Sequence, residues 1–218
     1  MKIGILWDLD GTLLDSLADL QDAVNYTLRH YGLPERTMEQ IRRFVGNGAG
    51  ELIRLALPGG EGDPPLQEAF AFFQAYYRTH ANIKTCPYAG VIQALEVLGQ
   101  RYPMAVVSNK PDAAVKLLCD EMFPHLYALG ERPECPRKPA PDMVWKAMAE
   151  LGVEKCVYVG DSEVDVRTGS NAGVPVLSVL WGFRDRQELE EAGGKYFCDD
   201  TAQLPAVIER IVEEVYGK

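Results

Sequence analysis

The stretch IGILWDLDGT, residues 3–12, decides the fold. Its first five residues, 3–7, are apolar without alternation, which is typical of a parallel strand buried on both faces. Further apolar runs that predict strands lie at 104–107, 156–159 and 174–179. Segments with the helical spacing of apolar residues lie around these runs, at 91–98, 112–122, 143–151 and 205–216. Strands that alternate with helices predict an α/β fold with a doubly wound parallel sheet.

Residues 16–83 interrupt this alternation, and we expect four helices and no strand there. Ser16 is a candidate N-cap for the first helix, and Thr37 with Gln40 has capping-box spacing at the start of the second. The third is expected at 51–57. The fourth carries an aromatic stripe, interpreted as core rather than as a substrate pocket: Phe70, Phe72, Phe73, Tyr76 and Tyr77.

The sequence therefore predicts a core domain of residues 1–15 and 84–218 and an inserted all-helical cap domain of residues 16–83. We interpret the insertion as a lid with hinges near 15–16 and 83–87; the alternative is a purely structural subdomain.

Composition restricts the function. The 218 residues carry a formal net charge of −10, with 47% hydrophobic and 25% charged residues. Such a surface repels nucleic acid and anionic lipid, so neither is expected as a partner. The five cysteines contain no C-x-x-C pair, and no apolar stretch approaches the length of a membrane span. We expect a cytoplasmic protein with reduced thiols, as a monomer or a small homo-oligomer.

Carboxylates follow two of the predicted strands where each strand ends. Asp8 and Asp10 come after 3–7, and Asp161 and Asp165 come after 156–159. Ligands of open parallel sheets bind beyond the carboxyl ends of the strands, so these acids converge if the two strands are neighbours. A divalent cation is the ordinary reason for such crowding, and Mg²⁺ fits best because it needs few protein carboxylates.

The pair Asp8 and Asp10 suits two chemical roles. Gly11 permits a turn directly after them, so the two carboxylates can flank one ligand. One can attack phosphorus, while the other protonates the leaving oxygen and then deprotonates water.

Two further segments carry weaker signals. Ser108, Asn109 and Lys110 follow the run 104–107 and could form an anion cradle, although Ser and Asn are also common turn residues. Lys138 lies on a proline-containing loop before a helix, where a cation is more often simply solvated.

Taken together and in this order, the four segments resemble the motifs of the haloacid dehalogenase (HAD) superfamily. The motifs are residues 8–16, 108–109, 138–139 and 160–165, and the resemblance covers essentially the whole chain. It implies a Rossmann-like core and a helical cap. Within the superfamily the chain is similar to the phosphoglycolate phosphatase branch, partly from residues 45–48 and 181–184.

The resemblance implies a role for each matching residue. Asp8 would be nucleophile and metal ligand, and Asp10 would be the general acid and base and offer its backbone carbonyl to the metal. Asp161 would bind Mg²⁺, and Asp165 would orient that shell. The implied catalytic set also includes Lys138, which would neutralise charge, and the implied substrate-binding set is Ser108, Asn109, Gly11 and Thr12.

The expected activity is Mg²⁺-dependent hydrolysis of a small phosphorylated metabolite through an aspartyl phosphate, with phosphoglycolate as the leading candidate. A phosphosugar mutase of the β-phosphoglucomutase type shares the same motifs and is the first alternative. A dehalogenase or phosphonatase is disfavoured, because those branches lack an acid at the position of Asp10. A non-catalytic phosphoacceptor or binding protein is the alternative from another class. Arg43, Asn47 and Lys110 are further candidates for substrate contact, against the interpretation that they are only solvated.

Overall fold

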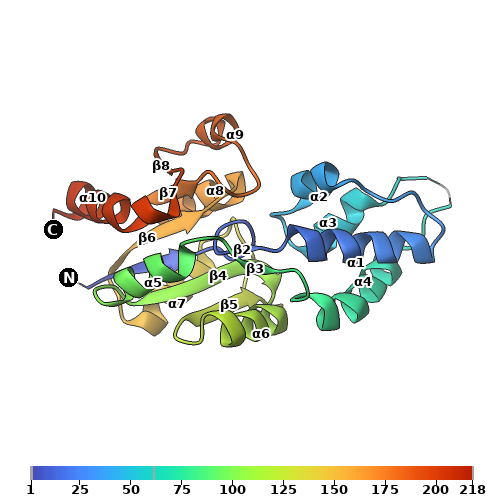
Figure 1. Cartoon of the computed structure of the whole chain (residues 1–218), viewed down its shortest axis with the longest axis horizontal. Helices are drawn as coiled ribbons and strands as arrows, with labels where there is room; N and C mark the ends of the chain where they lie inside the picture. Colours follow the sequence, from blue (N-terminus) through green and yellow to red (C-terminus); the bar gives the residue numbers. More distant parts are fainter. Residues whose placement is uncertain (1, 61, 218) are drawn as a thin grey trace.

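A six-stranded parallel sheet forms the centre of the computed structural model, which describes residues 2–60 and 62–217 (Figure 1). The strand order is β5-β4-β1-β6-β7-β8, and every neighbouring pair is parallel. The strands are β1 Ile3–Trp7, β4 Met104–Pro111, β5 Tyr127–Glu131, β6 Lys155–Gly160, β7 Val176–Val179 and β8 Tyr196–Cys198. The order reverses at β1, which creates a crevice at the carboxyl ends of β1, β4 and β6. The predicted doubly wound α/β fold is confirmed.

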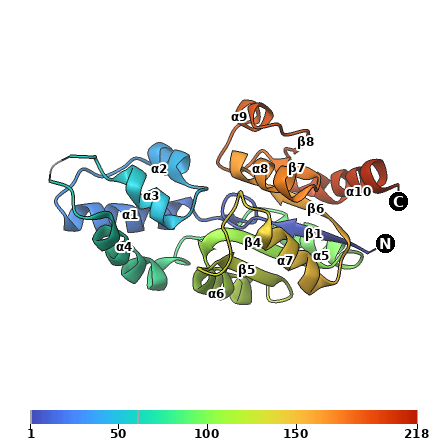
Figure 2. The ribbon, with the colours of Figure 1, turned by 180° about the vertical axis from the view of Figure 1, so that it is seen from behind.

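Helices cover both faces of this sheet (Figures 1 and 2). They are α5 Val91–Gly99, α6 Asp112–Met122, α7 Asp142–Leu151, α8 Glu163–Ala172, α9 Arg186–Glu191 and α10 Leu204–Tyr216, with a 3₁₀ turn, η1, at Thr201–Gln203. Successive side chains of β1 point to opposite faces of the sheet. Ile5 and Trp7 pack in one cluster with α5, α6 and α10, whereas Leu6 packs with α7. Burial on both sides explains why β1 lacks polar alternation.

The edges of the sheet differ from the prediction. The run at 174–179 begins two residues before β7, because Gly173 ends α8 in a left-handed conformation and the Val174 N–H still bonds back to Gly169. Strands β5 and β8 were not predicted, since both are edge strands with half-exposed residues. The sequence predicts a helix C-cap at Gly173, which the structure confirms as the end of α8, but it gave no range for this helix, because EVDVRTGSNA is rich in residues that favour caps and turns.

Four helices form the inserted segment: α1 Leu17–His30, α2 Met38–Phe44, α3 Ala49–Ala56 and α4 Leu66–His80. They share a hydrophobic cluster that also includes Phe183 of the core and is separate from the two clusters of the sheet. No strand occurs within the described residues 17–60 and 62–83. The chain enters through β2 Leu14–Asp15 and leaves through β3 Cys86–Pro87, which pair as antiparallel strands. This separate cluster favours the predicted division into cap and core, whose boundaries stay a prediction.

Local details of the cap agree with the sequence in part. The capping box of Thr37 and Gln40 is present at α2. Ser16 precedes α1 but caps nothing, because its hydroxyl bonds to Asp10 instead. Helix α3 begins two residues earlier than expected, at Ala49.

All five cysteines are free thiols, and four of them are buried. Among the described residues, none of the helices has both the length and the apolarity that a membrane crossing requires.

Candidate active site

The loop after β1 starts the candidate site. Asp8 extends the strand, because its N–H donates to the Val159 carbonyl of β6 at 2.8 Å. Gly11 then turns the chain with φ of +84°, in the left-handed region. A Cβ atom at this glycine would lie 2.3 Å from Asp161 Oδ2, so only glycine lets the loop approach that carboxylate.

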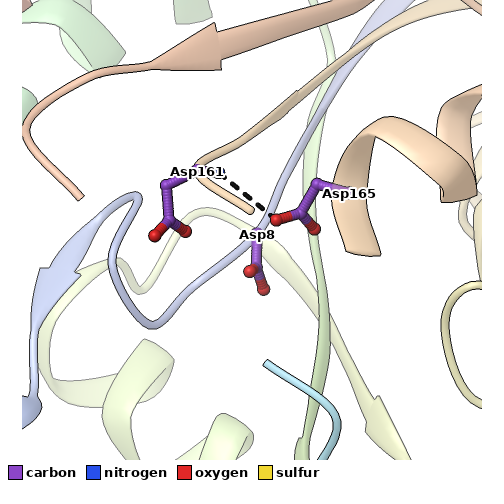
Figure 3. Close-up of side chains that lie close together, drawn as sticks. All are labelled: Asp8, Asp161 and Asp165. Atoms are coloured by element: carbon purple, nitrogen blue, oxygen red, sulfur yellow. Dashed lines mark hydrogen bonds between the residues drawn. The ribbon is translucent and has the colours of Figure 1, made fainter. Parts of the chain in front are cut away.

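Three aspartates form a buried acidic cluster at the carboxyl ends of β1 and β6 (Figure 3). One carboxylate oxygen from each of Asp8, Asp161 and Asp165 lies within 4.8 Å of the others. Burial, followed by repulsion from Asp165, raises the pKa of Asp161 to about 7 and holds the pKa of Asp8 well above its ordinary value. Buried carboxylates this close together are unfavourable without a cation, so the donor set fits a hard divalent metal.

Asp165 is held by the start of helix α8. Its Oδ2 accepts bonds from the Ser162 N–H at 3.1 Å and the Ser162 hydroxyl at 2.6 Å, and from the Asp161 N–H at 3.3 Å. Gly160 leaves room for this side chain, since a Cβ there would lie 2.3 Å from Asp165 Cβ. Asp165 therefore orients the loop that carries Asp161.

Lys138 lies between two of the three acids. Its ammonium is 2.8 Å from Asp8 Oδ1 and 2.8 Å from Asp165 Oδ1, and it donates to the Tyr158 hydroxyl at 3.0 Å. Burial alone would lower the pKa of this lysine, but Asp165 and Asp8 outweigh burial and raise the pKa well above its ordinary value. Lys138 is therefore a permanent buried cation rather than a solvated loop residue.

Asn109 positions Lys138. Its side-chain amide donates to the Lys138 carbonyl at 3.0 Å and to the Gly46 carbonyl of the cap at 3.1 Å, and its Oδ1 accepts from the Lys138 N–H at 2.8 Å. The side-chain amide is thus occupied by protein carbonyls. Ser108 lines the same cavity and accepts a 3.2 Å bond from the Lys110 N–H.

Asp10 lies outside the acidic cluster. Its carboxylate accepts from the Ser16 hydroxyl and from the Lys110 ammonium, at 2.9 Å to Oδ1 and 3.1 Å to Oδ2. Lys110 also donates to the Tyr77 hydroxyl of cap helix α4 at 2.6 Å. Of the four predicted metal ligands, the structure therefore gathers three carboxylates and pairs the fourth with a lysine.

A small cavity of about 50 Å³ joins these groups between cap and core. It is lined by Asp8, Asp10, Ser108, Asn109, Lys110, Lys138 and Asp161 from the core and by Gly46, Leu52 and Tyr77 from the cap, among others. Tyr77 was expected to be core only, and no sequence signal distinguishes it from the rest of the aromatic stripe.

The remaining candidates lie outside the lining of this cavity. Gly11 and Thr12 lie beside the Asp161 carboxylate but outside the cavity lining. The Thr12 hydroxyl donates to Asp161 Oδ1 at 3.0 Å. Arg43 is largely exposed and pairs with Glu39, and Asn47 is half-buried. The predicted substrate contacts of these residues stay predictions.

Comparison with known proteins defines the class. The haloacid dehalogenase-like hydrolase family profile matches residues 5–179, which include the whole acidic cluster. The chain belongs to this family, so the resemblance predicted from the four motifs is confirmed.

Individual relatives narrow the likeness to one branch of the family. The chain is 35% identical to the phosphoglycolate phosphatase of Rhodobacter capsulatus, over 96% of this chain and 98% of that one. It is 32% identical to phosphoglycolate phosphatase 1 of Pseudomonas aeruginosa, over 97% and 81%. A crystal structure from Lactobacillus delbrueckii, provisionally assigned as a phosphoglycolate phosphatase, has a TM-score of 0.86 and 34% identity over 94% and 98%.

Proposed function

We propose that the protein is a Mg²⁺-dependent phosphatase that hydrolyses a small phosphorylated metabolite through a phosphorylated Asp8. Phosphoglycolate is the leading substrate, because relatives that match nearly the whole chain carry that activity in their names. The single observation that carries the proposal is the buried cluster of Asp8, Asp161 and Asp165 with Lys138 beside it, at the carboxyl edge of the sheet.

The residues present suit Mg²⁺. Asp8 and Asp161 would hold the ion, with Asp165 orienting the loop and the Asp10 carbonyl as a further oxygen ligand. When bound, the ion would supply positive charge that offsets repulsion between carboxylate and phosphate.

The two oxygens of Asp8 differ in their surroundings. Oδ1 accepts the Leu9 N–H at 2.7 Å and lies 2.8 Å from the Lys138 ammonium. Oδ2 accepts no hydrogen bond from the described residues, so it is the oxygen open for attack on phosphorus. Each unit of repulsion at about 4 Å costs around 4 kcal/mol at an effective dielectric near 20, which Lys138 helps to offset.

The reaction then has two displacements. The Asp8 carboxylate forms a bond to phosphorus as the ester P–O bond breaks. Asp10, whose carboxylate pairs with Lys110 here, must first take up a proton, which it then gives to the departing oxygen. Asp10 next takes a proton from water, the water oxygen attacks phosphorus, and the bond from Asp8 to phosphorus breaks. Phosphate leaves, and both aspartates return to their starting states.

The test is a phosphate-release screen over small phosphate monoesters, with Mg²⁺ and with excess chelator. We expect the highest kcat/KM with a short phosphorylated acid, and loss of turnover on chelation that added Mg²⁺ restores. Turnover that survives complete removal of metal would contradict the proposal. Conversion of a hexose 1-phosphate to its isomer without phosphate release would establish the mutase alternative instead.

We also propose a cytoplasmic location, which the five free thiols support.

A further inference from the structure

Residues 181–184, which follow β7 after one intervening residue, contact three parts of the molecule. The Trp181 indole N–H donates to the Thr12 carbonyl in the loop after β1 at 3.0 Å. Gly182 lies so close to Asp161 that a Cβ there would be 2.3 Å from Asp161 Cβ. The Phe183 N–H donates to Asp161 Oδ2 at 2.7 Å, while the Phe183 ring packs in the hydrophobic cluster of the cap.

Arg184 completes this segment and reaches the end of cap helix α2. Its guanidinium donates to the carbonyls of Arg42 at 2.9 Å and Val45 at 2.9 Å, and to that of Arg43 at 3.4 Å. On the core side the same group donates to Glu163 at 2.8 Å. Arg184 is buried, with 8% of its surface exposed.

The end of α2 needs such a partner. The last carbonyls of a helix accept no hydrogen bond from the helix's own N–H groups. The negative end of the helix dipole also favours a cation there. Arg42 and Arg43 stand in the last turn of α2, but the side chain that bonds to the carbonyls there is Arg184, from the core. Arg184 therefore caps α2 only while the cap is docked on the core.

Other polar contacts between cap and core fall into two groups. Those of Asp19 with Lys84 and Thr85, and of Asn82 with Glu121, lie where the chain returns from the cap to the core. The bond from Asn109 to Gly46 and the bond from Lys110 to Tyr77 both involve residues that line the cavity. Arg184 does not line it. Its side chain therefore does not face the cavity, although its guanidinium bonds to the carbonyl of Val45, which does.

We propose that Arg184 is a positioning residue that holds the cap docked over the active site and so sets the affinity for substrate. The effect on substrate rests on the proposed phosphatase function. If the docked state is the binding-competent one, the apparent dissociation constant rises in inverse proportion to the docked fraction. Saturating substrate restores docking, so the rate at saturation is retained.

The test compares Arg184→Gln and Arg184→Lys with Arg186→Gln as a matched control. Arg186 lies two residues further on, at the start of α9, and its ion pair with Glu190 is exposed. We expect Arg184→Gln to raise KM about tenfold, because KM rises as the docked fraction falls, and to keep kcat within about twofold of the wild type. Arg184→Lys keeps the charge but has fewer hydrogen-bond donors, so its KM should lie between those of the wild type and Arg184→Gln. Arg186→Gln should have the KM of the wild type. A fall in kcat at unchanged KM would overturn the proposal.

A second readout needs no turnover. Spin labels at Gln74→Cys on α4 and Glu213→Cys on α10, in a Cys86→Ser background, report the distance between cap and core; both sites are exposed. The two helices lie at opposite ends of the molecule (Figure 1), so we expect one narrow distance distribution in the wild type and in Arg186→Gln, and an added, broader population in Arg184→Gln. Equal distributions in all variants would overturn the proposal. This measurement keeps its meaning if the phosphate-release screen fails, so the two proposals fail separately.

Discussion

Asp8 lies between opposing influences, since burial and Asp165 disfavour its charge while Lys138 favours it. Replacement by Asn removes the charge without removing the shape, so the fold should persist. We expect Asp8→Asn to retain less than about 1% of phosphatase activity, because an amide cannot act as the nucleophile. Steady-state phosphate release checks this, with thermal unfolding of the variant as the control for folding. Substantial residual turnover would remove Asp8 from the nucleophile role.

Asp161 predicts a pH dependence of stability in the metal-free protein. Its pKa is raised from 3.8 to about 7 in the folded state, so the folded state binds this proton more tightly than the unfolded chain does. The stabilisation from this group is complete below the ordinary pKa and is lost as pH rises through about 7. The free energy of unfolding of chelator-treated protein should therefore fall across this window.

Mg²⁺ should oppose this fall at the upper end of the window, because the cation binds the ionised carboxylates. Denaturant unfolding at several pH values, with and without Mg²⁺, measures both effects. Asp161→Asn is the matched variant and should show a smaller pH dependence. A wild-type protein with the same pH dependence as Asp161→Asn would contradict the assigned shift.

Single residues show how far sequence alone reaches at this site. Asp8, Asp161 and Asp165 were predictable as candidates for one cluster, because each follows the end of a predicted strand. That the two strands are neighbours was a condition of the prediction, since apolar runs do not give strand order. Taken alone, Lys138 looked like an ordinary loop cation, and only the family resemblance implied a role for it. Its closeness to two buried acids depends on the tertiary fold. Tyr77 meets Lys110 through cap docking, which no local pattern encodes.

Helix α2 illustrates the scale of the element, because its two ends are stabilised from different places. The Thr37 capping box satisfies the first turn from within the helix, and Arg184 satisfies the last turn from the core domain. Only the first of these was predictable, since a capping box needs residues three apart, whereas Arg184 is 139 residues from its Val45 acceptor.

The capping box gives a stability prediction. We expect Thr37→Ala to lower the free energy of unfolding by about 1 kcal/mol, because the Gln40 N–H loses its acceptor, the Thr37 hydroxyl. Thr79→Ala, on the exposed surface of α4, is the control and should change stability by less than about 0.5 kcal/mol. Denaturant unfolding checks both variants, and equal stabilities would show that the box contributes nothing.

Elements were predictable where apolar periodicity was strong. The central strands and α5, α6, α7 and α10 agree with the predicted ranges to within a few residues. Strands β5 and β8 lie at the edges, where half-exposed residues weaken the pattern. Only the C-terminal end of helix α8 was predictable, because its first turn carries Asp165, whose carboxylate bonds to the acidic loop instead of adding to an apolar stripe.

Over the whole molecule, the doubly wound sheet and the helical insertion both followed from the sequence, because strand runs and helix spacing are local. The position of the cap over the sheet did not, because it depends on contacts between residues far apart in the chain. Asn109, Lys110 and Arg184 each contact the cap from the core. The site is therefore complete only when both parts are in place.

The short antiparallel pairing of β2 with β3 has a consequence for how such proteins diversify. Leu14 lies opposite Pro87 and Asp15 opposite Cys86, so the insert leaves and rejoins the sheet domain at neighbouring points. A different set of helices could be grafted at this junction without rerouting any strand. Preference for a new metabolite could then arise by exchange of one module, while the residues beneath it keep their positions.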